Sequence, residues 1–321
     1  MPSISCFQCG TPIPPDADAC PRCYLVVRSK CRNCFEPVYL NEANCTKCKA
    51  RNVNYDPNWK KLRETVPVSF TVDGVDKLRE LDHLAPSIKK LVIKIDIDDP
   101  SCLKPVAQMR EIKIQGSKVN RIDYLNELKG IQLLTISETN IREITTLEKM
   151  PILKDLRIGS NKSLAYLGDS LSSNTLEYFN IGESRLQPCP TFNTPKLRAF
   201  GYNWGDIVDL DGLLSKVHAP MLEVFTGDHN LISKISGLSQ FPHLTFLSLS
   251  SNRITRIEGL DNLYNLKEVH FEGNPIADIA GLLHLTKLRR IFMNHSAIKK
   301  LPKNFYTTCE LHSEKGIEKI N

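Results

Sequence analysis

From residue 88 onward, hydrophobic residues recur with a period close to 22 positions. The clearest unit begins at Leu244, with aliphatic residues at frame positions 1, 4 and 6 and an asparagine at position 9. The same frame fits 22 residues earlier and 22 residues later. Its units begin at Ile88, Met109, Ile131, Leu153, Leu176, Leu197, Leu222, Leu244, Leu266 and Leu288. A period of this length predicts stacked copies of one small unit that together bury a continuous core.

Each unit reads as a short strand followed by a turn. Because side chains alternate along a strand, positions 1, 4 and 6 are expected to point inward, and positions 3, 5, 7 and 8 to face solvent. At position 9, an amide side chain can bond backbone groups where the chain leaves the strand. Asparagines 161, 230, 252 and 274 hold this position, and it is replaced in other units by Ser117, Thr139, Ser184, Gly205 and Ser296. We therefore expect a less regular spine in the middle of the array and at its ends.

The repeat resembles the 22-residue class of leucine-rich repeats, which is found in phosphatase regulatory subunits and bacterial internalins. The resemblance covers residues 88–305 and implies an α/β-type solenoid, a horseshoe with parallel β-strands on its concave face and 3₁₀ or extended segments on its convex side. Solenoids need capped ends. Residues 66–87 are predicted to form the N-terminal cap, because a strand-like run is followed by leucines at helical spacing. Residues 306–321 are predicted to form the C-terminal cap and tail.

Eight of the 11 cysteines fall within the first 48 residues as four C-x₂-C pairs, separated by ten, seven and ten residues. They are Cys6, Cys9, Cys20, Cys23, Cys31, Cys34, Cys45 and Cys48. One such pair can direct two sulfurs at one metal ion, and two pairs complete a tetrahedral shell. The equal ten-residue gaps favour pairing of neighbours, with the first four cysteines on one ion and the last four on another. In a reducing compartment such a cluster binds metal more readily than it forms disulfides.

The cysteine block resembles the all-β double zinc ribbon and is predicted to occupy residues 1–50, with residues 51–65 as a linker. The resemblance implies two structural Zn²⁺ ions, each closed by four thiolates that leave no position for a catalytic water. A cross-braced RING-type module is the alternative. In that family the middle ligand groups lie two or three residues apart, whereas Cys23 and Cys31 are separated by seven, and no histidine precedes His83.

The formal net charge of +6 does not by itself favour a nucleic-acid partner. Eight metal-bound thiolates lose eight protons and two Zn²⁺ ions restore four charges, so the zinc-loaded chain carries about +2. The ribbon segment is locally basic, which keeps contact with a nucleic-acid backbone as an alternative. We expect a cytoplasmic (intracellular) protein without a membrane partner, because no apolar run reaches membrane-spanning length and the first residues do not resemble a signal peptide.

Aromatic and amphipathic residues gather at the solvent-facing strand positions of the middle and late units. Such residues are enriched at the energetic centres of protein interfaces. The predicted partner-binding residues are Tyr178, Asn203, Trp204, Asp228, His229, Phe246, His270, Glu272, Phe292 and Asn294. Three of the aromatic residues, at 204, 246 and 292, are expected to be exposed and to have no structural role. The alternative is that some of these side chains lean onto neighbouring residues or onto an insertion, since the 25-residue unit starting at Leu197 has room for a bulge over Trp204.

The sequence contains no glycine-rich phosphate loop, no H-E-x-x-H and no G-x-S-x-G. We therefore expect a non-enzymatic protein-protein interaction scaffold or adaptor, without a small-molecule substrate. Its concave face would hold another protein, and its zinc ribbons would serve as a second docking module. Two alternatives are a nucleic-acid or ribosome-associated factor that uses the basic ribbons, and a ubiquitin-ligase-like component that requires cross-braced zinc sites.

Overall fold

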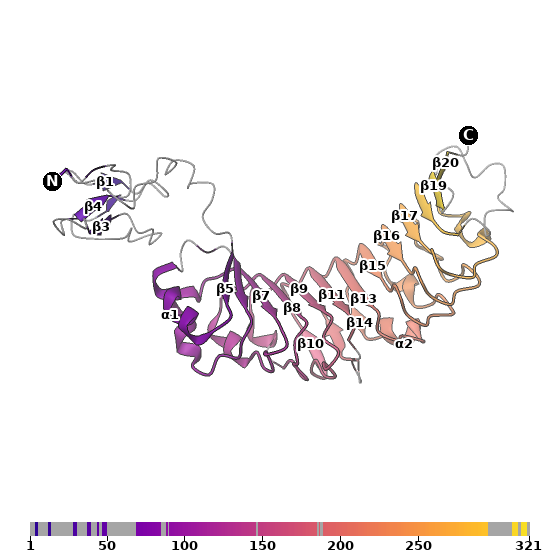
Figure 1. Ribbon diagram of the computed structural model, residues 1–321. Coiled ribbons are helices and arrows are strands. Elements are labelled where there is room, and N and C mark those ends of the chain that lie inside the picture. Colours follow the sequence, from indigo (N-terminus) through magenta and orange to yellow (C-terminus); the bar gives the residue numbers. More distant parts are fainter. Residues whose placement is uncertain are drawn as a thin grey trace.

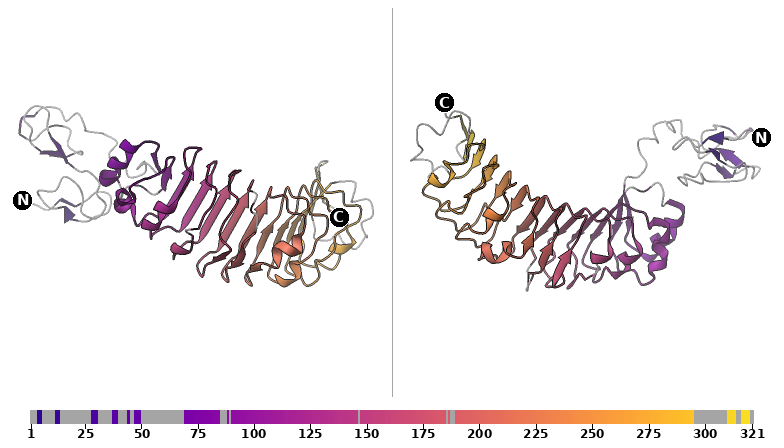
Figure 2. Two further views of the ribbon diagram at one scale, coloured as in Figure 1. Left: turned by 90° about the horizontal axis from the view of Figure 1, so that it is seen from below. Right: turned by 180° about the vertical axis from the view of Figure 1, so that it is seen from behind.

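A computed structural model describes most of the chain between residues 69 and 294 and shorter segments on either side. The described residues are 4–5, 12–13, 28–30, 37–39, 44, 47–49, 69–84, 88, 90–145, 147–184, 186, 189–294, 310–313 and 316–319. The main part is a curved solenoid whose strands line the inner side of an arc (Figures 1 and 2).

Within the described residues, 13 strands form one sheet. In spatial order they are β5 (Ser69–Val72), β6 (Lys90–Ile93), β7 (Glu111–Gln115), β8 (Leu133–Ser137), β9 (Asp155–Gly159), β11 (Tyr178–Gly182), β13 (Ala199–Asn203), β15 (Val224–Thr226), β16 (Phe246–Ser248), β17 (Glu268–His270), β18 (Arg290–Phe292), β19 (Glu310–Ser313) and β20 (Gly316–Lys319). Neighbouring strands are parallel from β5 to β19, and β19 pairs antiparallel with β20. Each predicted unit contributes one strand to this sheet.

The outer side of the arc carries the short elements that a 22-residue period allows. They are the 3₁₀ helices η2 (Pro100–Val106), η3 (Asp123–Glu127), η4 (Leu147–Lys149), η5 (Leu238–Gln240) and η6 (Ala280–Leu282), and the parallel strands β10 (Ser170–Ser172), β12 (Thr191–Asn193) and β14 (Val217–His218). The 25-residue unit adds a short helix on this side, α2 (Leu210–Leu214), visible in Figure 1. Its extra residues therefore do not cover Trp204, which is 54% exposed, and the bulge over this residue is not observed.

The N-terminal end of the solenoid carries a strand and a helix, within the segment predicted as a cap. Strand β5 pairs parallel with β6, and α1 (Val75–Leu84) follows. Val72 and Leu81 are fully buried. In the cysteine block, two antiparallel hairpins pair β1 (Ile4–Ser5) with β2 (Pro12–Ile13) and β3 (Arg28–Lys30) with β4 (Pro37–Tyr39).

Inward strand positions form the core, as the period predicts, and in the middle of the array they are phenylalanines. Phe179, Phe200 and Phe225 lie opposite one another on β11, β13 and β15. The ring centroid of Phe200 lies 5.6 Å from that of Phe179 and 5.9 Å from that of Phe225. Phe192 of β12 meets Phe200 edge-on at 5.1 Å from the outer side. These rings are almost completely buried and join the two sides of the solenoid.

A ladder of buried asparagines runs beside the core. The side-chain amide of Asn252 donates to the carbonyls of Gly227, Leu249 and Ser250 at 2.8 to 3.2 Å, and its oxygen accepts from the Ile232 amide at 3.0 Å. Two of these partners belong to the preceding repeat. Asn161, Asn230 and Asn274 also bond backbone groups of the repeat before them. The predicted role of position 9 is confirmed for all four asparagines.

Candidate concave-face binding site

The residue at position 8, where each strand ends, has a left-handed backbone in successive repeats. Its φ is positive in every unit from the one starting at Met109 to the one starting at Leu266. We call this row the left-handed column, and its members are Gly116, Glu138, Ser160, Glu183, Trp204, His229, Ser251 and Gly273. Only glycine adopts this conformation without steric cost; other residues are disfavoured by roughly 1–2 kcal/mol. The column sets a line of side chains along one edge of the concave face.

Trp204 and His229 are neighbours in the left-handed column and stack on each other. Their ring centroids lie 3.7 Å apart with an angle of 9° between the planes. The backbone amide of Trp204 donates to the Asp228 carbonyl at 3.0 Å, which ties the end of β13 to the next repeat. The indole is half exposed even with this stack in place. It therefore offers an ordered aromatic surface to solvent.

The repeat that carries Trp204 departs from the asparagine ladder for a packing reason. Tyr202 stands at an inward strand position and is 1% exposed. Its ring fills the space beside Gly205, where a Cβ atom would lie 2.2 Å from Tyr202 Cε1. Burial raises the pKa of the Tyr202 phenol, and a backbone hydrogen bond with Leu186 acts against that shift. The Tyr202 ring thus occupies the space that a side chain at position 9 of this repeat would need.

The loop that follows Trp204 is strained as well. Asp206 has a φ of 56°, and among the described residues it is the only one at frame position 10 with a positive φ. The amides of Gly205 and Ile207 are held by the side-chain oxygen of Asn230 at 2.9 and 3.0 Å. Backbone strain of this kind costs of order 1–3 kcal/mol and gathers at functional sites.

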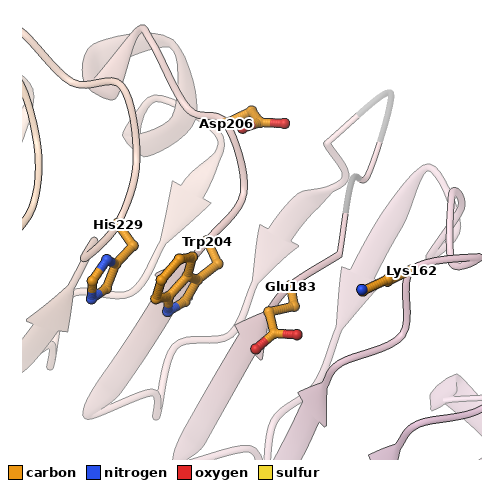
Figure 3. A pocket seen from close by; sticks show the side chains of 5 residues that line it. All are labelled: Lys162, Glu183, Trp204, Asp206 and His229. Atoms are coloured by element: carbon orange, nitrogen blue, oxygen red, sulfur yellow. The ribbon is translucent and has the colours of Figure 1, made fainter.

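A hollow of about 540 Å³ lies at the edge of the concave face beside Trp204. Its lining residues come from four successive repeats and are Lys162, Glu183, Trp204, Asp206 and His229. Figure 3 shows the indole between the imidazole of His229 and the carboxylate of Glu183, with Lys162 one repeat further along. We call this hollow the tryptophan hollow. An aromatic face and charged groups of both signs thus meet in one place.

A second hollow, of about 290 Å³, lies over the centre of the sheet. Arg157, Tyr178 and Thr226 are among the residues around it, and Ala199 and Gly201 form its floor. The side chain of Asn180 lies over Gly201, because a Cβ there would be only 2.1 Å from Asn180 Nδ2. Tyr178 is 46% exposed at the rim. Small residues therefore open the concave face at its middle repeats.

The late repeats carry a stack of alternating aromatic and imidazole rings. His270 lies 4.0 Å from Phe292 with an angle of 10° between the rings, and Phe292 lies 4.2 Å from His312. Phe246 packs against the other side of His270 at 5.1 Å. All four side chains are half-buried. The expectation that Phe246 and Phe292 lack a structural role is wrong, because each packs against a histidine of a neighbouring strand.

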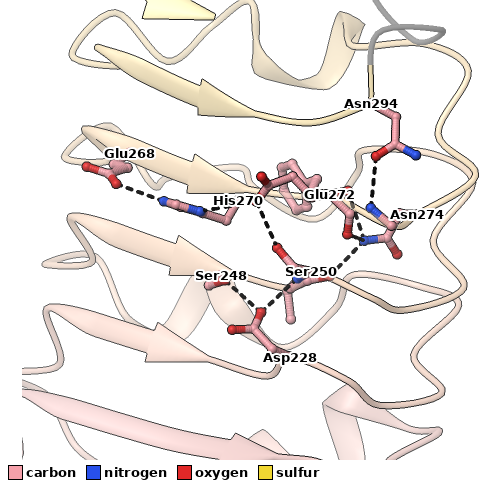
Figure 4. Close-up of polar contacts among 11 residues, drawn as sticks. Asp228, Ser248, Ser250, Glu268, His270, Glu272, Asn274 and Asn294 are labelled. Carbon is pink, nitrogen blue, oxygen red and sulfur yellow. Dashed lines mark hydrogen bonds and ion pairs between the residues drawn. The ribbon is translucent and has the colours of Figure 1, made fainter. Parts of the chain in front are cut away.

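Polar residues predicted to bind a partner are engaged between repeats (Figure 4). The Asp228 carboxylate accepts from Ser248 Oγ at 2.6 Å and from the Ser250 amide at 2.7 Å. Asn203 accepts from the Asp228 amide at 2.8 Å, and Asn294 accepts from the Gly273 amide at 2.9 Å. These groups hold the carboxyl ends of the strands in register.

His270 is also held by two glutamates, one on its own strand β17 and one two residues further along the chain. Its Nε2 lies 2.8 Å from Glu268 and its Nδ1 lies 3.5 Å from Glu272. Glu268 also pairs with Arg290 of the next strand. Of this group, Glu272 and Arg290 are exposed. The late repeats thus present a carboxylate beside a preorganised ring stack.

Charge is distributed unevenly along the concave face. From the unit starting at Leu176 onward, the described residues at solvent-facing positions include five carboxylates and one guanidinium, namely Glu183, Asp228, Glu268, Glu272, Glu310 and Arg290. The earlier units carry four basic and three acidic residues at the same positions, namely Lys90, Lys94, Lys113, Arg157, Glu111, Glu138 and Asp155. The aromatic half of the face is therefore also its acidic half.

Solved structures share this architecture. An internalin (inlF) from Listeria monocytogenes is 17% identical, with a TM-score of 0.50 over 75% of this chain and 76% of that chain. The TLR13–ssRNA13 complex is 16% identical, with a TM-score of 0.57 over 76% of this chain and 43% of that chain. The chain has the leucine-rich-repeat fold. No protein-family model matches the sequence, and no curated protein is similar to it at the level searched.

Within the leucine-rich-repeat solenoid, sequence reasoning missed Lys162, Glu183 and Asp206. Glu183 shares frame position 8 with Trp204, so the repeat alignment contained the signal for it. Lys162 and Asp206 follow the strand at position 10, where the direction of a side chain depends on the turn. His312, within the segment predicted as the C-terminal cap and tail, also joins the aromatic stack.

Of the eight predicted zinc ligands, only Cys48 lies within the described residues; Cys6, Cys9, Cys20, Cys23, Cys31, Cys34 and Cys45 lie outside them. In both described hairpins, the cysteines lie at the same places in the connection between the two strands. Six residues connect β1 to β2 and six connect β3 to β4, and in both connections the first and fourth residues are cysteines. Among the described residues, no group of three or more potential metal ligands is found.

None of the helices in the described part of the chain combines the length and apolar character needed to cross a membrane.

Proposed function

We propose that the chain is a non-catalytic interaction protein that holds a partner protein on the concave face of its solenoid. The observation that carries this proposal is the Trp204–His229 stack, an ordered aromatic surface that remains half exposed at a strained backbone position. Exposed, rigid aromatic side chains supply large contact area at low entropic cost, which is why they dominate interface energetics. The tryptophan hollow beside this stack and the second hollow over the middle of the sheet are both open and lined by residues from several repeats, a geometry suited to a macromolecular surface.

Replacement of Trp204 by glycine tests this proposal without unfolding the solenoid. The left-handed column already contains Gly116 and Gly273. Relief of the left-handed strain, roughly 1–2 kcal/mol, offsets the loss of the ring stack, about 0.5–1.5 kcal/mol. We therefore expect the urea midpoint of Trp204→Gly to stay close to that of the wild-type chain, while proteins captured on the concave face are lost.

In the capture experiment, the full chain is immobilised and incubated with native cell extract at moderate salt. The protein and the RNA that bind to it are then quantified. Tyr264→Ala is the matched control, because Tyr264 is 55% exposed and lies outside the strand positions. The proposal predicts a discrete protein that is retained by wild type and Tyr264→Ala and is lost with Trp204→Gly. If all three chains retain the same proteins, the concave face is not the binding surface.

We further propose that the cysteine block binds two structural Zn²⁺ ions and provides a second docking module. Support comes from the repeated hairpin and cysteine arrangement. Under 50 residues cannot build a sufficient core, so the metal would supply most of the folding energy of this segment. Eight thiolate ligands also favour a reducing, intracellular compartment for the protein.

Zinc content of the Cys20→Ser variant distinguishes the two possible zinc topologies. We expect the wild-type chain to bind two zinc ions and Cys20→Ser to bind one, because neighbouring cysteine pairs share an ion in a double ribbon. Native mass spectrometry of the intact chain gives both numbers. Substitution of Cys189, which belongs to the solenoid, is the control and should leave two ions bound. Loss of both ions from Cys20→Ser would instead support cross-braced sites and the ubiquitin-ligase-like alternative.

A nucleic-acid partner is the second candidate. The basic residues of the cysteine block favour it: Arg22, Arg28, Lys30, Arg32, Lys47, Lys49 and Arg51. The TLR13–ssRNA13 complex, which has the same fold, contains single-stranded RNA. Binding through phosphates would weaken steeply with salt. If RNA dominates the captured material, is released between low and moderate salt, and is unaffected by Trp204→Gly, the basic block is the functional end of the molecule.

A further inference from the structure

The tryptophan hollow has an asymmetry that indicates the chemistry of its occupant. His229 covers one face of the indole of Trp204 at 3.7 Å. The other face is turned toward Glu183, which precedes Trp204 by one repeat in the left-handed column (Figure 3). The open face of the indole and the carboxylate thus flank the same space.

Both of these walls favour a cation. The face of an aromatic ring carries negative charge density and attracts cations, most strongly for tryptophan. Among the described residues, none makes a hydrogen bond or an ion pair with the Glu183 carboxylate. An anion in this space would meet two repulsive walls, and among the described lining residues the one lysine or arginine is Lys162, one repeat further from the indole.

The shape of the space favours a planar cation. A guanidinium group stacks on an aromatic face and at the same time donates two parallel hydrogen bonds to a carboxylate. An ammonium group is compact and more strongly hydrated, so it gains less from a flat aromatic wall. The acidic balance of the late repeats extends the same preference over the neighbouring surface.

We propose that the tryptophan hollow binds the guanidinium group of an arginine side chain that the partner protein presents. This inference rests on the proposed function and adds the chemistry of the contact. In this arrangement the guanidinium stacks on the free face of Trp204 and pairs with Glu183, and His229 holds the indole in place from behind. Lys162 opposes the bound charge and limits the affinity.

A titration of the full chain with a minimal arginine probe tests the proposal. The chain has two tryptophans, so Trp59→Phe leaves Trp204 as the only tryptophan emitter. The probes are N-acetyl-arginine methylamide and its uncharged analogue N-acetyl-citrulline methylamide. We expect saturable quenching with a Kd on the order of 1 mM for the arginine probe, as its size allows, and roughly tenfold weaker binding of the citrulline probe.

Two charge variants give the decisive result, because their effects are opposite in sign. Glu183→Gln should weaken binding of the arginine probe by roughly threefold to fivefold, and Lys162→Ala should tighten it by about twofold to threefold. Glu138→Gln is the matched control, since Glu138 occupies the same column with a φ of 58° two repeats away. It should change the Kd by less than about 1.5-fold.

Reversed signs for the two variants, or equal binding of the two probes, would overturn the proposal. Its failure is distinguishable from failure of the proposed function. If a partner protein is captured in a Trp204-dependent manner but the arginine probe does not bind, the concave-face function stands and the guanidinium assignment falls. If the probe binds but no protein depends on Trp204 for capture, the function is wrong while the chemistry of the hollow is right.

Discussion

Replacement of Phe200 by alanine is expected to lower the free energy of unfolding by roughly 4 kcal/mol, and the loss should spread across three repeats. Truncation of a buried phenylalanine generally costs about 3–5 kcal/mol. The cost of truncating Phe200 is expected in the upper part of this range, because its ring contacts those of Phe179, Phe225 and Phe192. Urea unfolding followed by circular dichroism measures the total loss.

Hydrogen exchange shows where the stability of Phe200→Ala is lost. Because each repeat contacts mainly its neighbours, amides of β11, β13 and β15 should lose protection first, and those of β6 and β7 should keep theirs. Tyr178→Ala is the matched control, because its ring is 46% exposed one residue away from Phe179 and its loss should cost under about 0.5 kcal/mol. Similar losses in both variants would contradict the phenylalanine core.

Replacement of Asn252 by alanine is expected to cost about 3 kcal/mol, although the residue is polar and small. Its amide serves four backbone groups, and Asn252 itself is only 7% exposed. The Leu249 carbonyl also accepts from the Asn274 side chain at 2.8 Å, and the Ser250 carbonyl from the His229 amide at 2.9 Å. The variant therefore leaves the Gly227 carbonyl and the Ile232 amide without a partner among the described residues, and each such buried group costs about 1–3 kcal/mol. The urea midpoint and its slope measure the effect.

Asn265→Ala is the control for the asparagine ladder. Asn265 also donates to a carbonyl of the preceding repeat, Pro242, at 2.9 Å, but its hydrogen bond is exposed. Water can replace that bond, so the variant should lose under about 1 kcal/mol. Equal losses from the two variants would mean that burial of the ladder is not what makes it stabilising.

The period of the sequence was sufficient to predict the solenoid, because it records burial. Leucines and isoleucines at positions 1, 4 and 6 are inside wherever the structure describes them, since any other register would expose an entire strand face. The buried asparagines were also predictable, because a polar residue that recurs at the end of each strand indicates backbone N–H and C=O groups that need a hydrogen-bond partner. The repeat pattern was therefore enough to predict the architecture without any knowledge of tertiary contacts.

The binding surface was predictable only in part, since it depends on contacts between repeats. The sequence identified Phe246 and Phe292 as solvent-facing, but a stack through His270 could not be inferred from residues 22 positions apart. Gly205 could be identified as an irregularity, whereas its cause is the ring of Tyr202. Glu183 was missed although the repeat alignment places it at position 8, one unit before Trp204, because a single acidic residue at a solvent-facing position is typical of any protein surface.

The left-handed column has a consequence for how this surface could change over time. Each repeat presents one side chain whose backbone conformation is fixed by the strand end and not by the identity of that side chain. A substitution in the left-handed column changes which side chain the surface presents, while the core and the asparagine ladder stay intact. Glycine is the residue that occupies these positions without strain. Each repeat thus contributes one replaceable side chain to the binding surface, so single substitutions in the column can change binding specificity without destabilising the fold.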